Sequence, residues 1–228
     1  MSRILPILFN TEMVKAILDG KKTVTRRICK DGNDCTVPDM EFYDADKRTY
    51  AVHNYADAGH TQKLSVAERK CPICPRDVLY VWETWHKYTK RVGKGENCHI
   101  EEFYGYKASI ANSEDANEPW KPSIHMPKEA ARIWLKVADV RVERLQDMSE
   151  GDAFAEGVSP WDDRCYARNG WKPTLYDPDS GGSCCPLHAF EDIWNSTIKK
   201  SDLDRYGWDA NPWVWVIEFE RCEKPEEM

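Results

Sequence analysis

The chain carries short, strand-like apolar segments that are separated by long polar stretches, and this spacing restricts the folds open to it. The apolar segments cover residues 4–9, 23–28, 78–85, 132–145 and 213–219. Helical patterns cover only residues 11–18, 149–156 and 187–198. A parallel α/β sheet requires strands and helices in regular alternation, and that alternation is missing here. We therefore expect an α+β domain built on a curved sheet or a small barrel.

The boundaries of several elements follow from local patterns. Ser149 with Asp152 forms a capping pair that opens a short helix, and Gly157 ends it. Within residues 132–145 the apolar positions change parity, which predicts a bulge or turn near Ala138 and Asp139. In residues 213–219 the apolar and acidic positions alternate, which predicts a strand with one buried face.

The length of 228 residues suits one domain that carries sizeable insertions. Three polar stretches fit this interpretation as insertions or long loops: residues 29–70, 86–118 and 158–183. We find no internal repeat and no glycine-rich phosphate loop, so the common nucleotide-hydrolysing folds have no support.

Charge and cysteine content limit the partners and the compartment. The formal net charge of −7 predicts that the chain does not coat duplex DNA, so any nucleic-acid contact must use a local basic cluster. No apolar run approaches the roughly 18 residues of a membrane span. The apolar start of the chain is too short for a secretory signal, and nine cysteines is an odd number. We expect a cytoplasmic protein with reduced thiols, without a membrane partner; the sequence indicates no oligomeric state.

The densest chemical signal is the segment 20–27, GKKTVTRR, which places four cations and two hydroxyls directly after a helix end. A buried lysine among other cations has a lowered pKa and can act as a base, with a threonine as nucleophile. The alternative is that Lys21 and Lys22 complement the helix dipole while the arginines are solvated. Because Lys22 and Thr25 would face opposite sides of a flat strand, they meet only if Lys22 still lies in the turn after Gly20.

The pattern Gly20-x-Lys22-x-x-Thr25-x-Arg27, between a helix and a strand, resembles the signature of the ASCH-domain family. Further segments agree with that family in order: residues 77–83, 137–142, 155–157 and 215–219. Residues 120–127 are similar to the larger, prophage-type members. The resemblance implies a PUA-like fold, a mostly antiparallel β-barrel with a few flanking helices, here carrying long insertions.

The resemblance also implies an activity. Small bacterial ASCH proteins are amidohydrolases that remove the acetyl group from N4-acetylcytidine with a lysine, a threonine and a glutamate. By position these residues are Lys22, Thr25 and Glu156, and no cofactor is implied. Lys22 would take the proton of Thr25, and Glu156 would hold Lys22 or carry a proton to the leaving amine. The chain is about twice as long as those enzymes, so its insertions could cover or reshape the pocket.

A second function from another class stays open, namely a non-catalytic module that binds single-stranded RNA or a modified nucleotide, possibly as a phage accessory protein. In it the basic turn would bind phosphate through Lys21, Arg26 and Arg27. Trp82 and Trp85 would stack a base. Trp134, Trp194 and Trp215 are instead expected in the core.

Two further candidates have structural alternatives. Glu83 shares strand parity with apolar residues, which predicts either a functional carboxylate in an apolar wall or an edge glutamate that pairs with an arginine. Cys71 and Cys74 have zinc-knuckle spacing, and Cys184 with His188 could complete a structural site. A redox pair is another possibility, but free thiols are the favoured interpretation, and we predict no metal.

Overall fold

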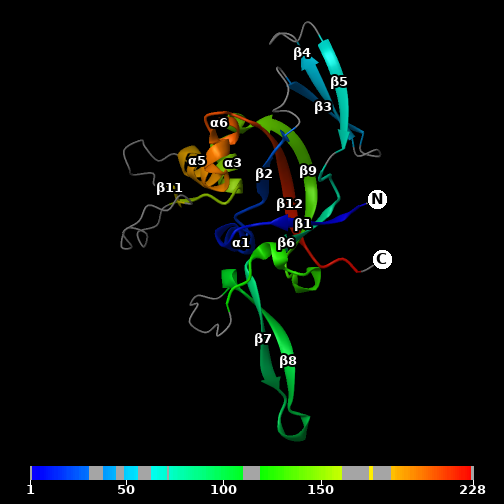
Figure 1. Ribbon diagram of the computed structural model, residues 1–228, viewed down its shortest axis with the longest axis vertical. Helices are drawn as coiled ribbons and strands as arrows, with labels where there is room; N and C mark the ends of the chain where they lie inside the picture. Colours follow the sequence, from blue (N-terminus) through cyan, green and yellow to red (C-terminus); the bar gives the residue numbers. More distant parts are fainter. Residues whose placement is uncertain are drawn as a thin grey trace. The chain divides into compact units, whose positions relative to one another are not determined.

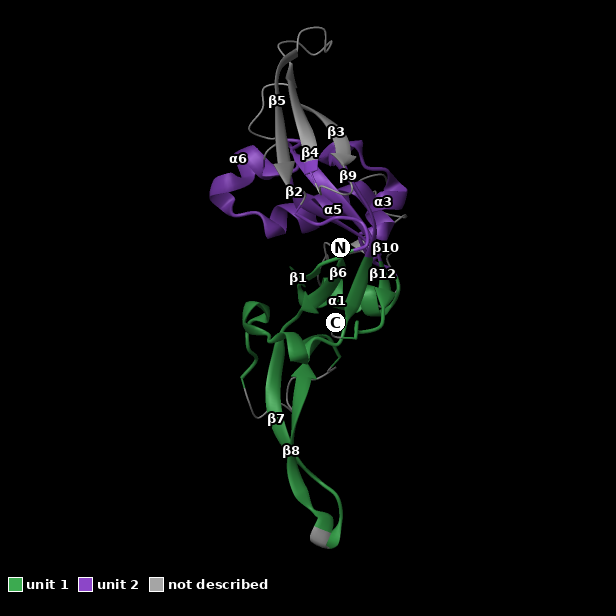
Figure 2. Cartoon of the chain, turned by 90° about the vertical axis from the view of Figure 1, so that its right-hand side faces the viewer, with its two compact units in different colours: residues 1–20, 77–136, 220–228 green, residues 21–76, 137–219 purple. Residues whose placement is uncertain are grey.

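The computed structural model describes residues 2–30, 38–44, 49–55, 63–70, 72–109, 119–160, 175–176 and 186–226 (Figure 1). These residues form two compact units, each assembled from segments that are distant in sequence (Figure 2). Unit 1 comprises residues 1–20, 77–136 and 220–228, and unit 2 comprises residues 21–76 and 137–219. The chain is thus α+β, as expected.

The largest sheet has five strands in the order β1-β6-β9-β12-β2. Their bounds are Ile4–Leu8, Val78–Trp82, Trp134–Arg144, Trp213–Cys222 and Val24–Ile28. Strand β1 runs parallel to β6, whereas β6 with β9 and β12 with β2 are antiparallel, so the sheet is mixed. Among the described residues this sheet is open, with β1 and β2 at its edges. The closed PUA-like barrel therefore stays a prediction.

Unit 1 contains β1, β6 and helix α1 (Thr11–Leu18), together with a ribbon of two antiparallel strands, β7 (Trp85–Val92) and β8 (His99–Tyr106). The side chain of Asn10 caps α1 by accepting from the Met13 amide, as its sequence predicts. A core of Trp85, Met126, Ala130, Ala131 and Trp134 lies in this unit. Short 3₁₀ turns connect its strands: Gly95–Asn97, Lys107–Ser109, Ser123–His125 and Lys128–Ala130.

Unit 2 places helices α3 (Glu150–Ala155), α5 (Pro186–Thr197) and α6 (Leu203–Tyr206) with β2 and β12. Two further 3₁₀ turns, Leu145–Asp147 and Lys200–Asp202, lie before α3 and α6. Its core joins one face of the strands to the helices through these residues: Val24, Leu145, Met148, Ala153, Val158, Ala189, Phe190, Trp194, Val214 and Val216. Trp134, Trp194 and Trp215 are all buried, so their predicted core role is confirmed.

The stretch 29–70, predicted as an insertion or a long loop, contains a sheet of its own. Strands β3 (Pro38–Asp44), β4 (Thr49–Tyr55) and β5 (Lys63–Lys70) form an antiparallel meander. Among the described residues these strands pair with one another and with no other strand. Their backbone hydrogen bonds therefore do not depend on the core-facing alternation that sequence periodicity detects. Residues 158–183 fall mostly outside the described residues, apart from the short parallel pair β10 (Ser159–Pro160) and β11 (Leu175–Tyr176).

The structure bears on three sequence predictions about the strands. Ala138 and Asp139 are consecutive exposed positions in β9, as the parity change indicates, but the strand stays continuous, so the alternative of a turn is wrong and the bulge stays a prediction. The predicted strand 78–85 is wrong at its end, because β6 stops at Trp82 and Trp85 opens β7. Strand β12 is buried on both faces instead of one, since Val214 and Val216 pack in the core of unit 2 while Trp215 and Ile217 on the other face are also buried.

None of the described helices has both the length and the apolar character needed to span a bilayer.

Candidate functional site: a buried lysine–glutamate network

The candidate site in unit 2 begins where the backbone of Thr23 is held between two elements. The Thr23 amide donates to the Ala155 carbonyl, and the Phe219 amide donates to the Thr23 carbonyl, each at 2.9 Å. Strand β2 begins one residue later, at Val24. Lys22 therefore precedes the strand. This is the placement in which strand alternation does not fix the direction of the Lys22 side chain. Its neighbours Lys21 and Thr23 are exposed, whereas the Lys22 side chain is only 1% exposed.

Glu156 meets Lys22 from the end of helix α3. Ser149 and Asp152 form a full capping box at the helix start, and Gly157, with φ of 97°, ends the helix as predicted. Glu156 is the C-cap residue, so both its carbonyl and its side chain lie at the helix end. The Lys22 ammonium donates to the Glu156 carbonyl oxygen at 2.9 Å and also to Oε2 of the same residue.

The electrostatics of Lys22 suit a base. Burial lowers the pKa of Lys22 below its ordinary value of 10.5 by destabilising the charged form, and this effect is the largest. The Glu156 carboxylate opposes the shift, while Arg27 and Arg26 add to it. The net direction is downward, so the neutral amine is reached at a lower pH than in an exposed lysine.

Arg26 binds the Glu156 carboxylate from a second side. Its side chain is 0% exposed and lies 3.4 Å from Glu156 Oε1, 3.4 Å from Asp152 Oδ1 and 3.5 Å from Glu143 Oε2. Its Nε has no hydrogen-bond partner in the described part of the chain. The predicted phosphate contact of Arg26 is thus not available in this structure, since three carboxylates already surround the guanidinium.

Arg141 extends the network along β9. It pairs with Glu143 and with Glu218 of β12, and its Nη2 lies 3.7 Å from Asp152. Burial opposes charge on Arg141, but the hydrogen bonds that it donates to Glu143 and Glu218 raise its pKa. Sequence reasoning missed Arg141, Glu143 and Glu218. Their one signal is that acidic and basic residues share a face at the end of an otherwise apolar strand.

Thr25 is buried in β2 and pairs in register with Ile217 of β12. By strand alternation Thr25 and Arg27 point to the side of β2 opposite Arg26. Within the described part of the chain no hydrogen bond joins the Thr25 hydroxyl to Lys22 or Glu156. The structure therefore brings Lys22 and Glu156 together and leaves Thr25 outside their hydrogen-bond network.

Arg27 is partly buried, and burial lowers its pKa while Glu156 acts in the opposite direction. Glu156 therefore lies within electrostatic range of three of the four cations in the segment 20–27, namely Lys22, Arg26 and Arg27. The fourth, Lys21, is exposed.

No family model, curated protein or solved structure matches the chain. The likeness to ASCH domains therefore rests on the sequence motif alone, and the family assignment stays a prediction.

The other predicted carboxylate, Glu83, lies in unit 1 and is 1% exposed. Arg132 binds it through two parallel hydrogen bonds, Nε to Oε1 at 2.8 Å and Nη2 to Oε2 at 2.9 Å. The third nitrogen, Nη1, donates to Ser109 Oγ at 2.6 Å, and the guanidinium lies 4.1 Å from the Tyr106 ring centroid. Of the two alternatives for Glu83, pairing with an arginine is observed, with Glu83 itself buried and Arg132 partly exposed.

The two tryptophans predicted to stack a base, Trp82 and Trp85, instead pack against other side chains of the protein. Trp85 is 6% exposed and packs in the core of unit 1, and Lys121 lies 5.0 Å from its ring centroid. Trp82 is partly buried and packs against the same core, with Tyr80 edge-on to its ring.

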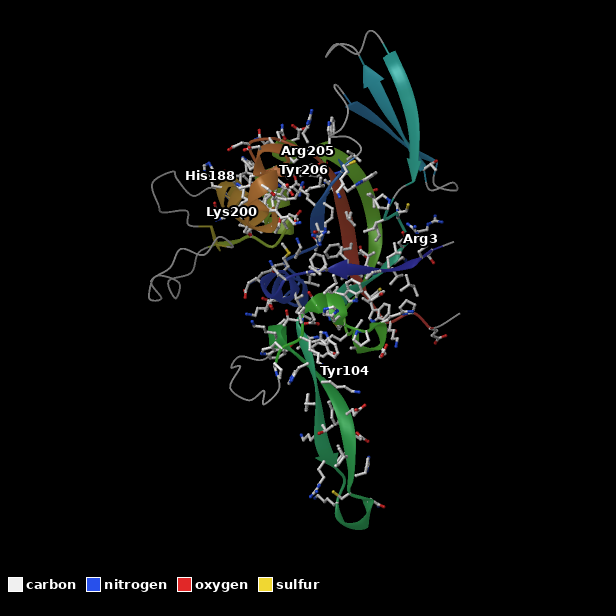
Figure 3. All side chains as sticks on the ribbon, in the orientation of Figure 1. Arg3, Tyr104, His188, Lys200, Arg205 and Tyr206 are labelled. Atoms are coloured by element: carbon white, nitrogen blue, oxygen red, sulfur yellow. The ribbon has the colours of Figure 1, made fainter. Side chains whose placement is uncertain are left out.

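The zinc hypothesis falls largely outside the described residues, which include neither Cys71 nor Cys184. Cys74 is buried, and His188 is exposed on α5 (Figure 3). Among the described residues, no three or more His, Cys, Asp or Glu side chains are grouped so that they could hold a metal.

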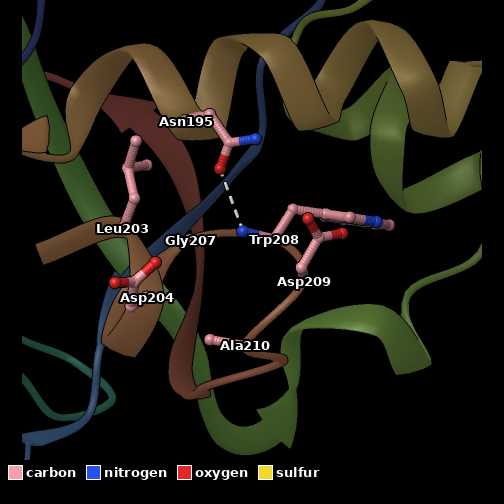
Figure 4. Close-up of a pocket in the computed structure, with 7 residues that line it drawn as sticks. All are labelled: Asn195, Leu203, Asp204, Gly207, Trp208, Asp209 and Ala210. Carbon is pink, nitrogen blue, oxygen red and sulfur yellow. Dashed lines mark hydrogen bonds between the residues drawn. The ribbon is translucent and has the colours of Figure 1, made fainter.

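Unit 2 also has an open cavity of about 340 Å³ (Figure 4). It is lined by Asn195, Leu203, Asp204, Gly207, Trp208, Asp209 and Ala210. The Asn195 side chain accepts from the Trp208 amide at 2.9 Å and fixes the loop that forms one wall. None of the predicted site residues lines this cavity.

Proposed function

We propose that the chain is an amidohydrolase acting on an acylated modified nucleoside, with N4-acetylcytidine as the representative substrate, and that it works in the cytoplasm as a PUA-like, ASCH-type protein. The observation that carries the proposal is the buried Lys22, whose pKa is lowered and whose ammonium contacts Glu156. A buried amine beside a carboxylate is a usual arrangement for general-base chemistry.

The reaction that fits these residues is acyl transfer through Thr25. Neutral Lys22 accepts the proton of the Thr25 hydroxyl as its oxygen attacks the acetyl carbonyl carbon. Collapse of the tetrahedral intermediate breaks the C–N bond, and the exocyclic amine leaves with a proton delivered from Lys22 through Glu156. Water then hydrolyses the Thr25 ester and releases acetate.

The mechanism assigns Arg26 a positioning role rather than a substrate contact. Its guanidinium holds Glu156 Oε1 while Lys22 holds Oε2, so the carboxylate is fixed from both sides. The same mechanism requires the Thr25 hydroxyl to come within hydrogen-bond reach of Lys22 when substrate is bound. Catalytic hydrogen bonds often tighten only in the complex with substrate.

Incubation with N4-acetylcytidine, followed by mass-spectrometric detection of cytidine and acetate, tests the activity directly. We expect turnover in the native protein, its loss in Thr25→Ala and partial retention in Thr25→Ser, which keeps a hydroxyl. The matched control is Lys199→Ala, which removes an exposed lysine of the same unit and is expected to leave turnover unchanged. Absence of turnover in native protein, or full turnover in Thr25→Ala, contradicts the proposal.

The second candidate is a non-catalytic module that binds RNA or a modified nucleotide. The observation that favours it is that the contact between Lys22 and Glu156 also fits a purely structural role. Two oxygens of Glu156 already accept hydrogen bonds from the Lys22 ammonium, and Thr25 is outside the network. Exposed Lys21 would then contact phosphate. Binding of N4-acetylcytidine without release of acetate would support this candidate over the first.

A further inference from the structure

The β7–β8 ribbon of unit 1 is a two-stranded sheet that extends beyond the rest of its unit (Figures 1 and 2). Its strands pair continuously from Trp85 with Tyr106 to Val92 with His99. Among the described residues, the one backbone bridge to another segment is at the base, between Trp85 and Lys121. Isolated two-stranded ribbons are marginal in water, so an extended one gains most from a bound partner.

The outer half of the ribbon is exposed on both faces. Its exposed residues include Tyr88, Thr89, Lys90, Arg91, His99, Ile100, Glu101 and Glu102. Two of these are large apolar side chains, with Tyr88 37% and Ile100 67% exposed. Both strand edges also lack a neighbouring strand beyond the base of the ribbon, as far as the described residues reach.

The charges of the ribbon leave unpaired cations. Glu102 is occupied by Lys87, with Nζ 2.6 Å from Oε2, and Glu101 is occupied by His99, with Nε2 2.7 Å from Oε1. The other cations of the ribbon have no ion pair with any residue that the structure describes: Lys90, Arg91 and Lys94. Over residues 85–106 four Lys or Arg side chains stand against three glutamates, so the ribbon has a formal charge of +1 in a chain whose net charge is −7.

A column of rings supports the exposed tyrosine. Tyr88 stacks on Phe103 with centroids 5.8 Å apart and on His86 with centroids 5.4 Å apart, and Trp120 lies against His86 at 4.6 Å. Gly105 faces His86 across the ribbon, and a Cβ there would lie only 2.0 Å from the imidazole Nε2. The ring of His86 therefore lies directly on the backbone, which anchors the column formed by Trp120, His86, Tyr88 and Phe103.

We propose that the outer half of the β7–β8 ribbon binds single-stranded nucleic acid along the edge of β7, where Lys90 and Arg91 project to opposite faces. There Lys90, Arg91 and Lys94 contact phosphates and Tyr88 stacks on a base. Aromatic rings beside cations are the combination that binds single strands without strong sequence preference. An exposed ring accepts an unstacked base, which a duplex does not offer. This site is separate from the proposed hydrolase site and does not depend on it.

Fluorescence anisotropy with 5′-labelled 12-mers of oligo(U) and oligo(A), on the full chain, tests the proposal. For Lys90→Gln with Arg91→Gln we expect binding weaker by about tenfold at low salt, and a plot of log K against log salt flatter by about 1.4, the value for two lost single-strand phosphate contacts. The matched control is Lys199→Gln with Lys200→Gln, which removes two exposed lysines of unit 2 and should leave binding unchanged.

The aromatic contact has its own pair of variants. Tyr88→Ala should weaken binding by about fivefold or more, whereas Tyr88→Phe keeps the ring and should bind as the native protein does. Circular dichroism confirms that these surface variants are folded. The proposal is overturned if the ribbon and control variants bind alike, if duplex RNA binds more tightly than single strands, or if the ribbon variants change only the self-association seen by light scattering.

The binding and hydrolysis proposals fail separately. Ribbon variants are expected to hydrolyse free N4-acetylcytidine at the native rate, and Lys22→Ala is expected to bind the oligonucleotides normally. Hydrolysis without oligonucleotide binding overturns the ribbon site alone, and oligonucleotide binding without hydrolysis overturns the enzymatic proposal alone.

Discussion

Two buried ion pairs of this protein, Glu83–Arg132 in unit 1 and Lys22–Glu156 in unit 2, differ in how completely their groups are satisfied. Arg132 places Nε and Nη2 on the two oxygens of Glu83 and Nη1 on Ser109, beneath the Tyr106 ring. Such a fork has little left to offer a ligand, so it is suited to holding the fold.

The network around Lys22 is not closed in this way. Arg26 reaches its three carboxylates only at 3.4–3.5 Å, and its Nε lacks a partner in the described part of the chain. Burial and neighbouring cations also lower the pKa of Lys22. A pair whose hydrogen bonds are all made stabilises the fold. A network with an unmade hydrogen bond and a lysine of lowered pKa can instead change its protonation or bind a substrate. The comparison predicts that the first pair matters for stability and the second for turnover.

The largest expected effect is on turnover when Lys22 is removed. Lys22→Met should lower kcat for N4-acetylcytidine by about 10²–10⁴, the usual contribution of a general base. The Glu156 carboxylate keeps Arg26 as a partner, so the variant should fold, which its circular dichroism spectrum checks. A variant that folds and retains more than a tenth of native kcat would show that Lys22 is structural, like Arg132.

The complementary change in the saturated pair should act on stability. Arg132→Met leaves Glu83 buried without its partner, and we expect a loss of about 2–4 kcal/mol, below the full value for buried pairs because Arg132 is partly exposed. Urea denaturation measures this loss. The double variant Arg132→Met with Glu83→Leu removes both charges and should recover most of it. A stable single variant that has lost turnover would reverse the assigned roles.

The sequence predicts those features of the two ion-pair regions that depend on residues close together in the chain. The cap formed by Ser149 and Asp152, the stop at Gly157 and the placement of Lys22 before β2 are local, and the sequence predicts each of them. The three strands between residues 38 and 70 are missed because they pair among themselves and show no core-facing period.

Contacts between distant residues are the part that sequence reasoning cannot supply. Arg132 is 49 residues from Glu83, and Glu156 is 130 residues from Arg26. The partner of each charge is set by which strands and helices adjoin, and periodicity gives no information on that. For Lys22 and Glu156 the family motif supplied the pairing, and their contact in the structure agrees with it.

The pH profile of hydrolysis distinguishes a catalytic base from a structural lysine by the direction in which substitutions near Lys22 shift its rising limb. Since neutral Lys22 is the active form, kcat/KM should rise with pH through a pKa below 10.5. Arg27→Gln removes a cation that lowers the pKa of Lys22, so the rising limb should move to higher pH. Glu156→Gln removes the group that raises this pKa, so the limb should move to lower pH, with a reduced maximum. Limbs that move together, or not at all, would exclude Lys22 as the titrating group.

The smallest expected effect concerns the helix that carries Glu156. Ser149→Ala removes the side chain that accepts from the Asp152 amide, and loss of such a cap costs about 1 kcal/mol. The substitution leaves Asp152 in place, so its 3.4 Å contact with Arg26 is not removed directly. We therefore expect a modest loss in urea denaturation together with nearly native kcat, since Lys22 and Arg26 still hold the Glu156 carboxylate. Ser149→Thr, which keeps a capping hydroxyl, is the control. A large drop of kcat in Ser149→Ala alone would mean that the capped helix, rather than Lys22 and Arg26, holds Glu156 in position.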